Sequence, residues 1–237
     1  MYKLYRYLRR GRPIDKNYFQ KLVRSRSSIR GFKSTPVNSE TITEVLEDAQ
    51  FTPSNCNTQP WDVHIVSGNI KDELSRKILE ANRNGQHTAD FSFDTKDYYA
   101  RYSERQIEQA IAYQQAMGID RNDREGRMRV VNLNYEFFHA PHVAFLFMPS
   151  FGDNVRVAAD IGMYGQSFLL ALAARGLGGV PQTSLGFFAN QVRESLDISE
   201  DMKLLFGISF GYPDEDFPGA LMRVGRDSVN KSVAFHS

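Results

Sequence analysis

The stretch that restricts the fold most is residues 154–175, which predicts a long helix packed into the body of the protein. Its apolar and small residues recur at intervals of three and four, the spacing that places side chains on one face of an α-helix. The stripe consists of Ala158, Ile161, Gly162, Gly165, Phe168, Leu169 and Leu172. Small residues at 158, 159, 162 and 165 would let another helix approach closely.

Strand-like segments are interleaved with further helical patterns along the chain. Strands are expected at 61–66, 142–148 and 203–213, and a strand or turn at 176–186. Further helices are expected at 15–25, 39–51, 70–84, 104–117, 123–138 and around 192–196. This mixture predicts an α+β protein in which helices flank one mostly antiparallel or mixed sheet.

The helix at 39–51 has the clearest boundary signals. Ser39 is expected to be its N-cap, and Glu40 suits the positive end of the helix dipole. Pro53 is expected to end it.

Composition excludes several classes of protein. The chain has 237 residues, with 29 basic and 28 acidic side chains and a net charge of +1. This balance gives no electrostatic reason to expect nucleic-acid binding. The single cysteine, Cys56, excludes an intramolecular disulfide framework. The apolar runs are shorter than the roughly 20 residues of a membrane span, so we expect a cytoplasmic protein without a membrane partner.

The first 14 residues are predicted to form a basic N-terminal arm, followed by one domain over residues 15–237. The arm carries five arginine or lysine residues before the first acid, Asp15. A targeting segment or a membrane-surface helix is one interpretation of this composition. The alternative, which we favour, is an arm that packs on the body or on a partner subunit.

Three familiar site motifs are missing. The glycines at 176, 178 and 179 do not fit a strand–GxGxxG–helix unit, so a Rossmann site is not expected. The five histidines have no metal-binding spacing, and we predict no metal. Cys56 has no cation nearby in the sequence that would activate it as a nucleophile.

A short cluster at residues 26–30 has a sharper chemical meaning. Arg26 and Arg30 supply planar bidentate donors, and Ser27 and Ser28 add hydroxyl donors. Such a set can hold a phosphate. A solvated helix terminus is the alternative interpretation of the same residues.

The segment PSNCNTQPW, residues 53–61, is polar, uncharged and stiffened by two prolines. It follows a helical pattern and precedes a strand-like one. Fixed amide and hydroxyl groups suit the edge of a neutral, hydrogen-bonding ligand.

Several of these segments, taken in order, resemble the nitroreductase family of FMN-dependent flavoproteins. The segments are RSSIRGF, PVNSETITEVLEDAQFTPSNCNTQPWDVHIVSG, AADIGMYGQSFLLALAARGLGGVPQTSLG, FGYPDED and a late RVGR. The resemblance extends from about residue 20 to residue 233, and the segment around 123–147 is similar to a bacterial branch that reduces nitroaromatic and nitrobenzoate-like compounds. It implies an intertwined α+β homodimer with FMN at the subunit interface.

The resemblance also implies roles for particular residues. The phosphate and ribityl chain of FMN would be held by Arg26, Ser27, Ser28, Arg30 and Arg226, with Arg223 as a weaker candidate. Many family members have RRS where this chain has RSS, so one cationic donor is missing at Ser27. The partner subunit would supply Pro53, Ser54, Asn55, Asn57 and Gln59, and the other face of the flavin would meet Pro181, Gln182 and Thr183.

The implied activity is transfer of electrons from NADH or NADPH through FMN to nitroaromatic or quinone-like acceptors, by a ping-pong mechanism. No acid–base residue is assigned as catalytic, because the flavin supplies the chemistry. The aromatic segment 91–102 is expected either to face the acceptor or to serve packing alone. Other flavin chemistry on the same scaffold, such as dehalogenation or flavin fragmentation, and a non-enzymatic flavin sensor or store remain alternatives.

Overall fold

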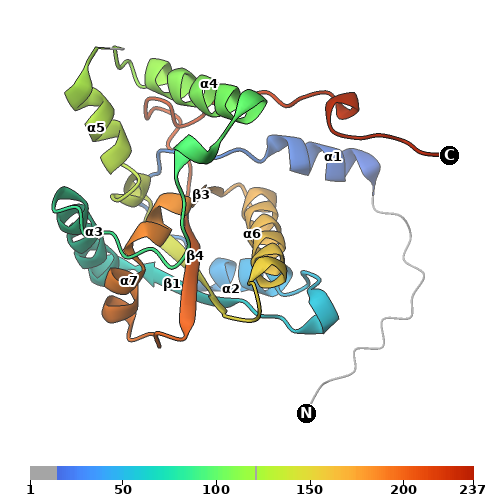
Figure 1. Ribbon diagram of the computed structural model, residues 1–237, viewed down its shortest axis with the longest axis horizontal. Helices are drawn as coiled ribbons and strands as arrows, with labels where there is room; N and C mark the ends of the chain where they lie inside the picture. The colour runs from blue at the N-terminus through green and yellow to red at the C-terminus, as the bar shows by residue number, and fades with distance from the viewer. Residues whose placement is uncertain (1–14, 121) are drawn as a thin grey trace.

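The structure is a computed structural model that describes residues 15–120 and 122–237 (Figure 1). The basic arm predicted at residues 1–14 lies outside the described residues. The domain expected from residue 15 onward has one central sheet with helices on both of its faces.

The sheet has four antiparallel strands, which agrees with the α+β prediction. The strands are β1 (Asp62–Ser67), β2 (His142–Pro149), β3 (Gly178–Gln182) and β4 (Met202–Gly211). Their order across the sheet is β1-β2-β4-β3. Strand β2 is buried along almost its whole length because both of its faces are covered.

One face of the sheet is covered by α2 (Ser39–Ala49) and α6 (Val155–Ala174). Alternate residues of β2, among them Ala144 and Leu146, point into this layer. Gly165 leaves room for the ring of Phe206, because a Cβ atom there would lie 2.9 Å from it. By length and hydropathy alone α6 could cross a membrane, but half of it is buried here, as in the core helix of a folded domain.

The opposite face is covered by α3 (Gly68–Arg83) and α7 (Ala189–Leu196) (Figure 1). Here the other set of β2 side chains, including Phe145 and Phe147, packs with Leu74 and Val192. The two sets of β2 side chains therefore divide the core into two layers, one for each pair of helices.

Three helices lie outside these two layers: α1 (Lys16–Ser25), α4 (Ala100–Ala116) and α5 (Arg124–Asn132). Figure 1 shows α1 and the C-terminal segment side by side, extending away from the sheet. No residue of α1 is buried, and Tyr18 and Phe19 are each 57% exposed. The apolar side chains of this helix are therefore largely uncovered in the single chain.

Several predicted helix boundaries differ from the structure, and two of these differences have a local explanation. Helix α5 ends at Asn132 rather than at 138. Residues 133–136 form turns, and Phe137, Phe138 and His139 then take positive φ angles of 55°, 51° and 63°, through which a helix cannot continue. That turn leads into Pro141, which disfavours helical backbone in the residue before it. The N-cap of α2 is Asn38 rather than Ser39, since the Asn38 side chain accepts a hydrogen bond from the Thr41 N–H at 2.7 Å.

Candidate cofactor site

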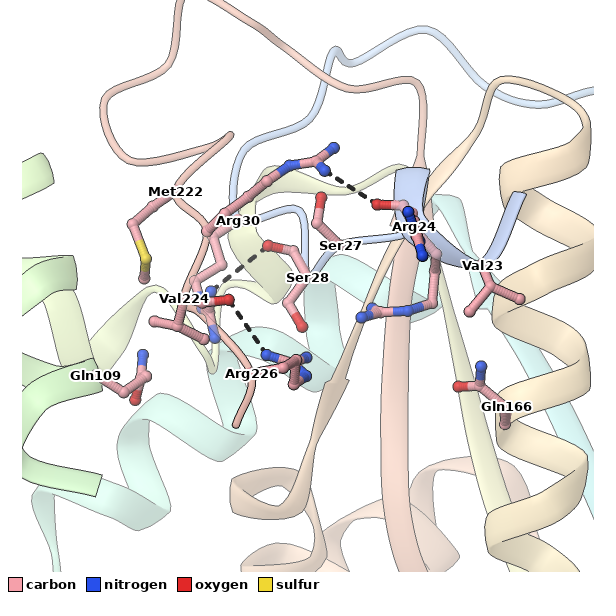
Figure 2. Close-up of a pocket in the computed structure, with 12 residues that line it drawn as sticks. Val23, Arg24, Ser27, Ser28, Arg30, Gln109, Gln166, Met222, Val224 and Arg226 are labelled. Atoms are coloured by element: carbon pink, nitrogen blue, oxygen red, sulfur yellow. Dashed lines mark hydrogen bonds between the residues drawn. The ribbon is translucent and has the colours of Figure 1, made fainter. Parts of the chain in front are cut away.

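A cavity of about 520 Å³ collects the arginine and serine residues singled out in the sequence (Figure 2). Its lining includes Arg26, Ser27, Ser28, Arg30 and Arg226. The first four follow the end of α1, whereas Arg226 comes from the C-terminal segment almost 200 residues later. The fold therefore joins the two basic segments that the sequence leaves far apart.

Strand β3 holds the 26–30 segment in place. Ser28 forms an isolated parallel bridge with Gly179, and the Ile29 N–H donates to the Gly179 carbonyl at 3.3 Å. Gly178 must lack a side chain, because a Cβ atom there would lie 2.6 Å from Ile29. The N–H of Arg30 donates to the carbonyl of Ala220, which links the same segment to the C-terminal region.

The guanidinium groups around this cavity repel one another. Partial burial lowers the pKa of Arg26, and the nearby charges of Arg226 and Arg223 lower it further. The pKa of Arg30 is also lowered by burial, and its guanidinium lies 5.0 Å from the centre of the Tyr113 ring. A bound anion would offset both the desolvation of these cations and their mutual repulsion, so the cavity favours an anionic ligand.

The two C-terminal arginines have different local roles. Arg223 donates to the backbone carbonyls of Arg24 and Ser25 at 3.1 and 2.9 Å, and so ties the C-terminal segment to the end of α1. Arg226 donates only to carbonyls of its own segment, those of Val224 and Gly225. Arg226 is thus the better placed of the two to turn toward a ligand, whereas Arg223 has a structural task.

The loop at 53–59 lies apart from the arginine-lined cavity. None of its predicted site residues, Pro53, Ser54, Asn55, Asn57 and Gln59, lines that cavity. The loop packs instead against α6, where both carboxylate oxygens of the buried Asp160 accept the Asn55 N–H at 3.1 Å. Just before the loop, Thr52 donates to the hydroxyl of Ser167, also on α6.

The same loop is held in a strained shape by its own hydrogen bonds. Cys56, Asn57 and Gln59 have φ angles of 52°, 55° and 47°. The Ser54 hydroxyl accepts the Gln59 N–H at 2.9 Å, and the Gln59 side chain donates to the Asn57 carbonyl. Positive φ is uncommon for residues such as Cys and Gln. Strained backbone of this kind is found most often at functional sites. These hydrogen bonds hold the backbone of the loop in one conformation.

The segment Pro181–Thr183 presents alternate residues to solvent. Pro181 and Thr183 are exposed, whereas the Gln182 side chain is buried and forms hydrogen bonds through both its amide nitrogen and its amide oxygen. Gln182 donates to the Asn134 carbonyl at 2.8 Å and accepts from the Ser209 hydroxyl. Gln182 can therefore meet a ligand only through its backbone.

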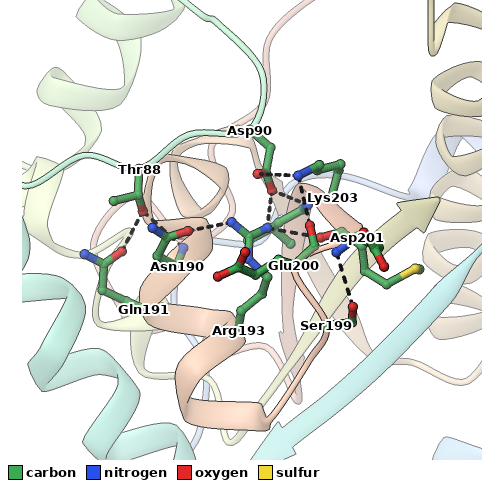
Figure 3. A network of polar contacts seen from close by, with 11 residues as sticks. Thr88, Asp90, Asn190, Gln191, Arg193, Ser199, Glu200, Asp201 and Lys203 are labelled. Carbon is green, nitrogen blue, oxygen red and sulfur yellow. Dashed lines mark hydrogen bonds and ion pairs between the residues drawn. The ribbon is translucent and has the colours of Figure 1, made fainter. Parts of the chain in front are cut away.

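The aromatic segment 91–102 is anchored at its start by a buried ion pair (Figure 3). Asp90 contacts Arg193 at 2.6 Å, and both side chains are less than 10% exposed. The same Asp90 oxygen accepts the Leu204 N–H at 2.8 Å. Beyond this anchor, Phe91 and Phe93 border a small cavity of about 160 Å³ that Thr183 also lines. The segment thus lies beside the end of β3.

Sequence reasoning missed the residues that position the site. Asp160 and Asp90 each hold a loop by accepting backbone N–H groups, and Gln109 and Gln166 line the arginine-lined cavity. Asp160 could have been found from the sequence, because it is a charged residue directly before Ile161 of the apolar stripe. Asp90 had no such signal, since its partner Arg193 is distant in the sequence.

Comparison with known proteins agrees with this geometry. Residues 23–212 match the model of the nitroreductase family. The chain is 35% identical to nitroreductase NfnB of Mycolicibacterium smegmatis, covering 91% of this chain and 92% of that protein. It is 32% identical to 4-nitrobenzoate reductase of Pseudomonas putida, covering 92% and 95%. The chain therefore belongs to the nitroreductase family.

A solved structure supports the same assignment. The crystal structure of the FMN-dependent nitroreductase NfnB from Mycobacterium smegmatis in complex with NADPH matches with a TM-score of 0.89 and 34% identity. The match covers 93% of this chain and 99% of that one. The α+β architecture and the order of its elements are therefore those of this family.

Proposed function

We propose that this protein is an FMN-dependent oxidoreductase that passes electrons from NADPH or NADH to nitroaromatic or quinone-like acceptors. The observation that carries the proposal is the arginine-lined cavity with its two serines. The relatives described as an FMN-dependent nitroreductase and a 4-nitrobenzoate reductase support the reaction and the acceptor class.

The residues of the cavity fit the phosphate end of FMN. Arg26 and Arg226 supply charge, and Ser27 and Ser28 supply hydroxyl donors for the phosphate and the ribityl chain. Arg30 lines the same cavity and would add a further guanidinium for the phosphate and the ribityl chain. When bound, FMN supplies the chemistry of accepting hydride from a nicotinamide and passing electrons on.

The rest of the chain orients the ring system and limits the access of water. Exposed Pro181 and Thr183 would lie along one face, and backbone N–H groups there would favour negative charge on the ring. The 53–59 loop, held by Asp160, would supply fixed polar groups to the flavin of a second subunit. Since donor and acceptor would use one open face in turn, we expect ping-pong kinetics.

A homodimer is part of this proposal. The uncovered apolar face of α1 and an exposed stripe on α6, which includes Ala159, Gly162 and Met163, both need a partner surface. A Cβ atom on Gly162 would meet nothing within 4 Å, so a helix of a second copy has room to approach. Val233 and Phe235 in the extended C-terminal segment are also exposed.

Mixing two defective variants tests whether the site is shared. Arg26→Ala combined with Arg226→Ala removes phosphate donors, whereas Ser54→Ala combined with Asn57→Ala alters the loop. Random mixing of subunits should restore about a quarter of the native sites, because half of the dimers would be mixed and each would rebuild one site. If mixing restores no activity, each site is built from a single subunit.

The first experiment on function is to identify the cofactor. The purified protein should be yellow, and the flavin released by heat should be FMN by mass spectrometry. Initial rates with a nitroaromatic acceptor should then give parallel double-reciprocal lines. A colourless protein that does not bind added FMN would contradict the proposal.

Two alternatives give different outcomes. A flavin sensor or store would bind FMN but show no turnover with nicotinamide and acceptor. Dehalogenation or flavin fragmentation would give products other than reduced nitro groups, which product analysis would identify. The relatives that match along almost the whole chain favour nitro reduction.

A further inference from the structure

The guanidinium group of Arg30 rests on an aromatic ring. Its central carbon lies over the ring of Tyr113, 5.0 Å from the ring centre. Its Nη1 atom also donates a long hydrogen bond to the Ser28 carbonyl at 3.5 Å (Figure 2). Burial lowers the pKa of Arg30, and among the described residues no carboxylate acts on it. The contact with Tyr113 is therefore the main support of this partly desolvated cation.

Tyr113 reaches Arg30 from outside the proposed phosphate site. It is the only buried residue of α4, a helix that the structure describes completely. It lines a neighbouring cavity of about 570 Å³, which Arg30 also borders. It is not part of the lining of the arginine-lined cavity, whereas Arg30 is. Tyr113 can thus act on a ligand of that cavity only through Arg30.

A glycine of the C-terminal region makes room for the Tyr113 ring. Gly219 has a φ angle of 72°, and a Cβ atom there would lie 2.9 Å from Cε2 of Tyr113. The next residue, Ala220, accepts the backbone N–H of Arg30 through its carbonyl at 3.3 Å. The backbone and the side chain of Arg30 are therefore both held where α4 and the C-terminal region meet the 26–30 segment.

The ring of Tyr113, rather than its hydroxyl group, supports the guanidinium. Burial raises the pKa of Tyr113 to about 12, so the phenol is neutral at neutral pH. The hydroxyl is buried and has no hydrogen-bond partner among the residues that the structure describes. The attraction is therefore that of a cation to the face of a ring, which strengthens as water is excluded. It leaves the N–H donors at the edge of the guanidinium available to a ligand.

We propose that Tyr113 is a positioning residue for FMN, whose ring holds the Arg30 guanidinium at the wall of the arginine-lined cavity. The inference rests on the proposed function, because it takes FMN as the ligand of that cavity. Without the ring, the Arg30 side chain would have to be ordered at the moment of binding. That ordering would reduce the affinity for FMN, although Tyr113 itself does not touch the phosphate.

The first measurement is the FMN affinity of the apo-protein, by titration of the flavin fluorescence. Tyr113→Leu should raise the Kd about 3- to 30-fold, because the contact between cation and ring is lost. Tyr113→Phe keeps the ring and should stay within about twofold of the wild type. Met117→Ala is the matched packing control and should also stay within about twofold. Met117 lies beside the same glycine, 3.0 Å from the Cβ position of Gly219, but does not line the arginine-lined cavity.

A double-mutant cycle separates positioning of Arg30 from a purely structural role of Tyr113 in docking α4. Arg30→Ala should weaken FMN binding by itself. Adding Tyr113→Leu to Arg30→Ala should cause no further loss, because the ring would have no cation left to hold. A purely structural role would instead give the same loss with or without Arg30.

Three results would overturn the proposal. They are wild-type affinity in Tyr113→Leu, equal losses in the two backgrounds, and a Tyr113→Phe variant as weak as Tyr113→Leu. If Tyr113→Leu does not fold by circular dichroism, Tyr113→Met replaces it, because methionine fills the space flexibly without an aromatic face. Failure of the proposed function gives a different result, since the wild type itself would then bind no FMN in the same titration.

Discussion

Both carboxylate oxygens of Asp160 accept the backbone N–H of Asn55, each at 3.1 Å. This contact joins the buried face of α6 to the polar loop that the proposed function assigns to the flavin of a second subunit. The loop contains three residues in the left-handed region, so it needs such an external anchor to keep its shape.

Replacing Asp160 should therefore damage both folding and cofactor binding. Asp160→Ala removes a hydrogen bond between a carboxylate and the Asn55 N–H, and should lower the free energy of unfolding by about 1.5–3 kcal/mol. FMN affinity should fall as well, since the loop loses its anchor. Asp160→Asn keeps one oxygen acceptor and should be milder in both respects. Denaturant unfolding and FMN titration measure the two effects, and an Asn variant worse than the Ala variant would contradict this role.

Arg226→Ala should weaken FMN binding far more than it alters turnover at saturating FMN. A charge-assisted hydrogen bond to phosphate contributes about 1.5–3 kcal/mol, which corresponds to a loss of roughly 10- to 150-fold in affinity. Activity should be lost on dilution and recovered with excess FMN. Arg76→Ala, at an exposed position on α3, is the control and should show neither effect. Unchanged affinity would remove Arg226 from the site.

The Asp90–Arg193 pair should be one of the main determinants of stability. Removing one partner leaves the other charge buried, so Asp90→Asn should lower the free energy of unfolding by about 3–5 kcal/mol. Glu44→Gln is the control, because its contact with Arg175 is partly exposed and should contribute less than about 1 kcal/mol. Urea denaturation compares the two variants. Equal losses would mean that the buried pair has no special importance.

His142 should make the stability of the protein depend on pH. Its Nε2 atom accepts the Val37 N–H at 2.9 Å, so the folded ring is neutral. Burial, helped by the charge of Lys71, lowers the pKa of His142 below its ordinary value of 6.5. Between the lowered pKa and 6.5 the unfolded chain binds more protons, so stability should fall as pH drops through this window.

The measurement is the free energy of unfolding against pH. His142→Gln keeps an acceptor for Val37 and should flatten the slope below pH 6.5. His139→Gln, which replaces an exposed histidine, is the control variant. Equal slopes in the wild type and His142→Gln would show that another group is responsible.

Local patterns were sufficient for most of the elements. The stripe on α6 and the alternation in β1 depend on the period of a helix or a strand, which neighbouring residues encode. The predicted end of α5 was wrong because turns follow Asn132 and three later residues take positive φ, and no glycine or proline between 133 and 139 signals either. The N-cap shifted by one residue because Asn38 competes with Ser39 for the same role.

The site was only partly accessible from sequence. The residues at 26–30 form a cluster along the chain, but only the fold brings Arg226 beside Arg26. Asp90 and Arg193 meet across more than 100 residues, and no local period relates them. Residues of α4 and α5 line a common cavity of about 570 Å³ only because the fold brings the two helices together there, which is a tertiary property.

The most direct test of the account is to follow the bound flavin without oxygen. The purified protein is mixed anaerobically with NADPH alone, and the visible absorption of oxidised FMN is recorded. It should be lost without any acceptor and restored when a nitrobenzoate is added, as the nitro group takes up the electrons and is reduced. If the absorption stays unchanged until both substrates are present, or never changes, the proposed route of the electrons is wrong.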